Sequence, residues 1–104
     1  MKTTDEMILD LVARGFKLPE GIWRESAEQG EPPESWWCLN GHRANKSNPV
    51  LRNTILQQAH DLCAMEFARQ AVPQLWHETR LTAGRYLMAG DSAGAIAALW
   101  EATK

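Results

Sequence analysis

Apolar residues that recur every three or four positions are the feature that most constrains how this chain can fold. They are clearest between Pro49 and Ala71, where a helical wheel at ~100° per residue gathers them on one broad face. Asn48 and Pro49 are typical of an N-cap followed by a first helical residue. The sequence therefore predicts one long amphipathic helix over 49–71. Its predicted apolar face comprises Leu51, Ile55, Leu56, Ala59, Leu62, Cys63 and Phe67.

A capping box marks the start of a first helix near the N-terminus. Thr3 and Glu6 stand three residues apart, which lets each side chain accept a hydrogen bond from the other's backbone. Gly15 followed by Phe16 suits a Schellman stop, in which glycine takes the left-handed conformation and the next apolar residue folds back. We therefore expect a helix over about 4–14.

Further helices are expected over 19–30, 73–90 and 92–102. Pro19 and Pro73 both suit a first helical turn, and strand-like alternation of apolar and polar residues is weak throughout. The predicted fold class is therefore all-α in the main. About five helices pack in one compact, bundle-like domain that spans residues 1–104.

Residues 30–48 form the least regular segment of this domain. Pro32-Pro33 interrupts any helix. Asn40-Gly41 is the strongest short signal for a tight turn between two strands, so one small hairpin is expected near residues 35–45. A loop of this length in a compact domain usually carries function or is partly disordered.

Charge and cysteine content narrow the classes of partner and compartment. The formal net charge is −2 and both signs are mixed along the chain, which disfavours nucleic acid as a partner. Cys38 and Cys63 do not make a disulfide framework, and no apolar run is long enough to span a bilayer. The sequence predicts a cytoplasmic protein without a membrane segment.

Tryptophan is abundant, and two of the five tryptophans are adjacent in the irregular segment. Neighbours on an extended segment project to opposite faces, so Trp36 and Trp37 cannot both face one core. One of them can anchor a partner or pack across a homodimer. The sequence predicts a non-enzymatic protein-interaction module, an adaptor, inhibitor or regulator. Its predicted partner-binding residues are Trp36, Trp37, His42, Arg43 and Lys46.

A zinc site is the alternative. Cys38 and His42 are separated by three residues, and His60 and Cys63 by two. Zinc favours four such ligands, and close pairs form half a site each. Such a site would staple the irregular segment to the long helix, in a domain that could contact nucleic acid. No other metal or cofactor is expected.

Catalysis by Cys63 is a third hypothesis. His60, Cys63 and Glu66 lie on adjacent turns of the predicted long helix. A thiol nucleophile needs a nearby base, a group that orients the base and a site that stabilises an anion. The sequence offers no clear anion site, so this hypothesis ranks below the other two. Glu66 falls within the apolar face and is expected to form a salt bridge between two helices, with candidate partners Arg52, Arg69, Arg80 and Arg85.

Residues 83–102 resemble part of a tetratricopeptide repeat, a helical hairpin of about 34 residues. The resemblance covers about a fifth of the chain, and no second copy precedes it. It implies two antiparallel helices with Gly90-Asp91 at the turn, and no peptide-binding residues are carried over from it. The matching positions are Ala83, Tyr86, Gly90, Asp91, Ala95, Leu99 and Ala102.

Overall fold

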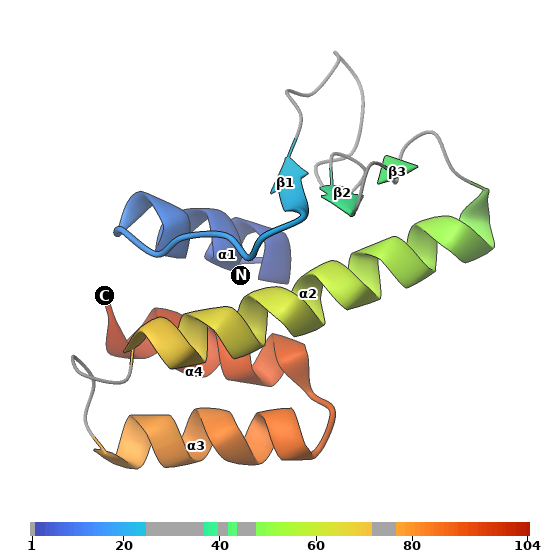
Figure 1. Ribbon diagram of the computed structural model, residues 1–104. Coiled ribbons are helices and arrows are strands. Elements are labelled where there is room, and N and C mark those ends of the chain that lie inside the picture. The colour runs from blue at the N-terminus through green and yellow to red at the C-terminus, as the bar shows by residue number, and fades with distance from the viewer. Residues whose placement is uncertain (1, 25–36, 40–41, 44–47, 72–76) are drawn as a thin grey trace.

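The computed structural model describes residues 2–24, 37–39, 42–43, 48–71 and 77–104, and only the backbone at 23–24, 37–39, 42–43, 77 and 80 (Figure 1). The described part of the chain contains four helices and one small sheet. The helices are α1 (Thr4–Ala13), α2 (Pro49–Ala71), α3 (His77–Met88) and α4 (Ser92–Ala102). The strands are β1 (Ile22–Arg24), β2 (Trp37–Leu39) and β3 (His42–Arg43).

The prediction of a mainly helical domain is confirmed, but the number of about five helices is too high for the described residues. The helix expected over 19–30 is wrong where the structure describes it, because residues 22–24 form β1. Gly21 takes a left-handed conformation with φ 83°, which an α-helix cannot contain. Ile22 then pairs with Leu39 of β2. Residues 25–30 lie outside the described residues.

The hairpin expected near residues 35–45 is confirmed. β2 and β3 pair antiparallel with Leu39 opposite His42, so Asn40-Gly41 is the two-residue connection, itself outside the described residues. β1 pairs with the other edge of β2, giving the strand order β1-β2-β3. The hairpin lies against α2, on the side opposite to α3 and α4 (Figure 1).

Local signals fix the ends of α1 as predicted. The Thr3 hydroxyl accepts a hydrogen bond from the Glu6 amide at 3.2 Å, and the Glu6 carboxylate accepts one from the Thr3 amide in return. At the other end, the Phe16 amide donates to the Leu11 carbonyl at 3.1 Å across Gly15, whose φ is 111°. This is the Schellman stop, and it turns Phe16 back toward the core.

The long helix α2 has the predicted bounds. The Asn48 side chain accepts a hydrogen bond from the Leu51 amide at 2.9 Å, which caps the first turn. The predicted apolar face is largely buried or half-buried, but Leu51 at its outer end is 39% exposed. The fully buried members of that face are Ile55, Ala59, Cys63 and Phe67.

Helices α3 and α4 form the predicted helical hairpin. The Asp91 amide donates to the Tyr86 carbonyl at 2.8 Å across Gly90, and the Asp91 side chain then caps α4 by accepting from the Gly94 amide at 2.8 Å. The Tyr86 ring lies where a Cβ on Gly94 would be only 2.5 Å away. Glycine at position 94 therefore lets the aromatic ring pack against the start of α4.

The core is closed by α4, which packs against α1, α2 and α3. Trp100 and Asp10 tie α4 to α1, because the indole Nε1 donates to the Asp10 carboxylate at 2.8 Å. Arg14 donates to the Trp100 carbonyl at 2.8 Å. The largest fully buried side chains come from α1, α2 and α4, and are Phe67, Ile8, Leu11, Ile55, Ile96, Leu99 and Cys63. Among the helices described, none combines the length and apolar character needed to cross a membrane.

Candidate functional site

The predicted partner-binding residues belong to the hairpin and its flanks. Trp37 begins β2, and His42 and Arg43 make up β3, so all three lie on the hairpin that rests on α2. Their side chains, and residues Trp36 and Lys46 altogether, lie outside the described residues. The structure therefore shows only that the backbone of β2 and β3 lies against α2.

Apolar side chains are exposed at the start of α2, shortly after the irregular segment 30–48. Val50, in the first turn of α2, is 79% exposed, and Leu51 is 39% exposed. The described part of the chain leaves most of Val50 and more than a third of Leu51 uncovered, three and four residues after position 47. A large exposed aliphatic chain at the start of a helix adds nothing to the core and is available to a partner.

Three elements carry the predicted zinc ligands, and two of them lie against the third. β2 and β3, which hold Cys38 and His42, contact α2, which holds His60 and Cys63. The side chains of Cys38 and His42 lie outside the part of the chain that the structure describes. Among the described side chains, no group of three or more histidine, cysteine or acidic residues is arranged to hold a metal ion.

His60 has a partner that the sequence did not indicate. Its Nε2 lies 3.1 Å from Oδ1 of Asp5, a mostly buried carboxylate in the first turn of α1. The contact joins α1 to α2 across 55 positions of sequence. Carboxylates are common in the first turn of a helix because the helix dipole favours them there, so Asp5 did not stand out.

Cys63 is fully buried among apolar residues of the core. Burial, helped by the negative charge of Asp5, raises the pKa of its thiol from 9.0 to about 12. At neutral pH this group is a protonated thiol without access to solvent, whereas a nucleophilic cysteine is exposed and has a lowered pKa. The geometry therefore offers no support to Cys63 as a nucleophile.

Glu66 does not link two helices as expected. Its carboxylate pairs with Arg69, one turn further along α2, and accepts a hydrogen bond from Gln70 at 3.2 Å. The bond from Arg69 holds the pKa of Glu66 below its usual value. Arg69 is one of the predicted partners, so the ion pair is confirmed, but its expected place between two helices is wrong, because Arg69 lies on the same helix.

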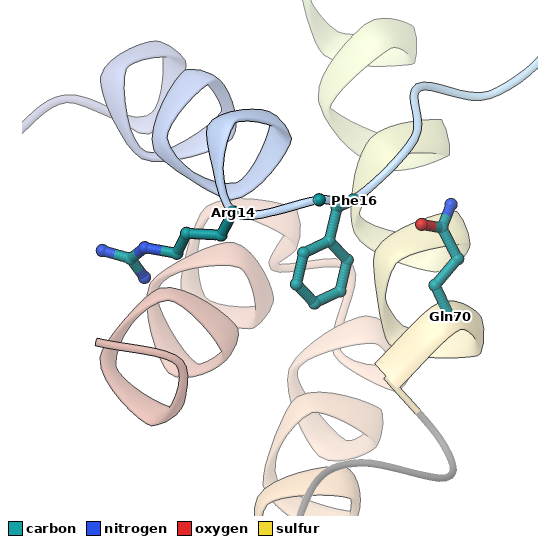
Figure 2. Close-up of a pocket in the computed structure, with 4 residues that line it drawn as sticks. Arg14, Phe16 and Gln70 are labelled. Atoms are coloured by element: carbon teal, nitrogen blue, oxygen red, sulfur yellow. The ribbon is translucent and has the colours of Figure 1, made fainter.

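A depression of about 280 Å³ lies where α1 ends, lined by Arg14, Gly15, Phe16 and Gln70 (Figure 2). Arg14 and Gln70 stand on opposite sides of the Phe16 ring (Figure 2). Arg14 donates to the end of α4, and the Gln70 amide is bound to the backbone of Lys17. The polar groups of this depression bond to the protein's own backbone and do not point together toward a ligand. We therefore regard the depression as a structural junction, here called the joint, and not as a binding site.

Gln70 is the main hydrogen-bonding residue of that joint. Its Oε1 accepts from the Lys17 amide at 2.8 Å and its Nε2 donates to the Lys17 carbonyl at 2.7 Å. We expect Gln70→Ala to lower the free energy of unfolding by about 1–2 kcal/mol, since its two hydrogen bonds to Lys17 and the one to Glu66 are lost. Urea unfolding monitored by circular dichroism measures this. Gln58→Ala, an exposed position on the same helix, should change stability by less than about 0.5 kcal/mol. Equal effects of the two substitutions would contradict the assignment.

A second depression, of about 270 Å³, lies on the other side of α2, where the α3–α4 turn meets it. It is lined by Asp61, Met65, Leu87, Gly90 and Ser92. Oδ1 of Asp61 accepts two hydrogen bonds, one from the Ser92 hydroxyl and one from Gln57 Nε2 at 2.8 Å. No sequence pattern indicated this arrangement, because Ser92 comes from 31 positions away.

Comparison with known proteins adds no functional assignment to this geometry. No protein-family model matches the chain, and no curated protein or solved structure is significantly similar to it.

Proposed function

We propose that this protein is a small non-enzymatic interaction module, an adaptor, inhibitor or regulator that acts by binding another protein in the cytoplasm. Its contact surface, here called the hairpin surface, comprises Trp36, Trp37, His42, Arg43 and Lys46, extended by Val50 and Leu51 on the first turn of α2. The observation that carries this proposal is the exposure of Val50, 79%, two residues after the end of the irregular segment 30–48 that contains Trp36 and Trp37. The same stretch of sequence carries tryptophan and arginine, which are two of the residue types enriched in binding hot spots.

The setting of the hairpin also supports an interaction role. A two-strand hairpin alone is only marginally stable in water. Here β1 adds a third strand and α2 provides a continuous helical support for β2 and β3. A rigid support holds contact side chains in place before binding, which lowers the entropy that association costs.

Three single substitutions test the proposal, namely Trp36→Ala, Trp37→Ala and Val50→Ser. We expect Val50→Ser and at least one tryptophan variant to weaken partner binding by about tenfold or more, because hot-spot truncations cost about 2 kcal/mol or more. The partner is obtained by copurification with the tagged wild-type protein and its affinity is measured by calorimetry. Met88→Ser is the matched control, because Met88 is 91% exposed but lies on α3, away from the hairpin.

Thermal unfolding of each variant separates loss of binding from loss of folding. The proposal fails if both tryptophan variants lose stability equally while partner binding is unchanged. A homodimer is the special case in which the partner is a second copy. Sedimentation would then show a dimer that the same substitutions dissociate and Met88→Ser leaves intact.

A zinc-stapled domain, one that could contact nucleic acid, is the second candidate, and one observation favours it. The strands bearing Cys38 and His42 rest on the helix bearing His60 and Cys63. A bound zinc ion would require deprotonated thiolates and would hold the hairpin on α2. Elemental analysis of the purified protein decides between the candidates. Less than one zinc per chain, with folding unchanged in chelator, excludes the staple.

A further inference from the structure

The depression on the α3 and α4 side of α2, here called the Asp61 pocket, combines one carboxylate with apolar walls. Met65 is 52% exposed and Leu87 is half-buried, and together they supply the aliphatic lining. Gly90 brings backbone without a side chain to the rim, which keeps the pocket open. A ligand that fits must therefore carry both a charged group and an aliphatic part.

The hydrogen bonds of Asp61 define which charged group fits. Both donors within reach, Gln57 and Ser92, bond to Oδ1. Among the described residues, none donates a hydrogen bond to Oδ2 and none forms an ion pair with Asp61. A carboxylate whose second oxygen has no donor from the described residues can accept one charge-assisted hydrogen bond from a bound cation.

The charge around the pocket is negative. Asp91 lies in the adjoining turn and likewise forms no ion pair with a described residue, since its side chain caps α4. The amino end of α4 offsets this by roughly half a charge. The two negative charges of Asp61 and Asp91 exceed the half positive charge at the amino end of α4. The pocket therefore favours a cation.

We infer that the Asp61 pocket binds the side chain of a lysine supplied by a protein partner. The ammonium group donates to Oδ2, and the four-carbon stem lies along Met65 and Leu87. Arginine fits less well, because its planar fork is best matched by a carboxylate with both oxygens available. The pocket lies where α2 meets the α3–α4 turn, whereas the backbone of β2 and β3 lies on the opposite side of α2, so the pocket constitutes a second contact point whose existence does not depend on the first (Figure 1).

Capped tripeptides with a central lysine, arginine or norleucine are the probes, together with the free diamine putrescine. Amide correlation spectra of the full-length protein report binding at Gly90 and Ser92. We expect saturable shifts with the lysine peptide, and binding of the norleucine and arginine peptides that is weaker by about threefold or more. Asp61→Asn should weaken lysine binding by a similar factor while keeping an oxygen for Ser92 and Gln57. Glu78→Gln, which removes one exposed carboxylate on α3, should leave lysine binding unchanged.

Several results would overturn the inference. The first is an absence of saturable shifts with the lysine peptide. The second is binding of the norleucine peptide as tightly as the lysine peptide. This comparison uses only the wild-type protein, so it does not depend on the folding of a variant. Tighter binding of the arginine peptide refutes the choice of lysine, and putrescine binding at least as tightly as the lysine peptide refutes a partner side chain. Trp36→Ala and Trp37→Ala should leave these shifts unchanged, so a failure here is distinguishable from a failure of the hairpin surface.

Discussion

Replacing Phe67 with alanine is expected to lower the free energy of unfolding by about 3–5 kcal/mol. Phe67 is fully buried at the centre of the core, on the inner face of α2. Its ring also meets the ring of Phe16 edge-to-face, with centroids 5.5 Å apart and an interplanar angle of 67°. Because domains of this kind are stable by only about 5–15 kcal/mol, one substitution removes a large share of the total. Urea unfolding monitored by circular dichroism measures the loss.

Two further variants serve as controls. One makes a smaller change in volume at position 67, and the other removes an apolar side chain at an exposed position. Phe67→Leu keeps most of the volume and should cost clearly less than alanine. Met88→Ala removes an apolar side chain that is exposed, and should change stability by less than about 0.5 kcal/mol. A loss below about 1 kcal/mol for Phe67→Ala would show that the core is not centred on this ring.

The thiol of Cys63 is expected to react about a thousandfold more slowly in the folded protein than in urea at neutral pH. Its pKa is about 12 when folded against an ordinary 9.0, so the fraction of reactive thiolate falls by about three powers of ten. Burial slows the reaction further. Labelling with Ellman's reagent measures both rates, in a Cys38→Ser background so that only Cys63 reports. Rapid labelling of the folded protein would contradict this burial and revive the enzyme hypothesis.

The same raised pKa predicts a loss of stability at alkaline pH. Between pH 9 and 12 the thiol ionises in the unfolded chain but stays protonated in the folded one. Its stabilising contribution is therefore fully present below pH 9 and is lost as the pH rises. By pH 11 the loss is about 2–3 kcal/mol. Adding Cys63→Ala to the Cys38→Ser background should flatten this pH dependence, and an unchanged slope would assign it to other groups.

Helix ends were predictable because the residues that set them are neighbours in sequence. Asn48 caps α2 through the Leu51 amide, and Thr3 caps α1 through Glu6. Gly90 ends the α3 segment by the left-handed turn that glycine permits. Each signal lies within four residues of what it controls, so the bounds of α2 and α4 agree with the prediction.

Strand β1 was not predictable because its partner lies elsewhere in the chain. Ile22-Trp23-Arg24 is compatible with a short helical face, and only pairing with 37–39 makes it a strand. The same holds for the polar contacts: Asp5 meets His60 across 55 positions, and Ser92 meets Asp61 across 31. The β2–β3 hairpin could be predicted from Asn40-Gly41, whereas the Asp61 pocket exists only once α2 and α4 are packed.

The tie between α1 and α4 has a consequence for how the chain reaches its native state. Trp100 and Arg14 join the first and last helices across 86 positions, and Trp100 and Asp10 across 90. Contacts of such high sequence separation raise the contact order and slow folding relative to a bundle of locally paired helices. During synthesis α1 emerges long before its main helical partner exists. A chain interrupted after Met88 would keep the apolar face of α1 open to solvent, as a target for chaperones and proteases.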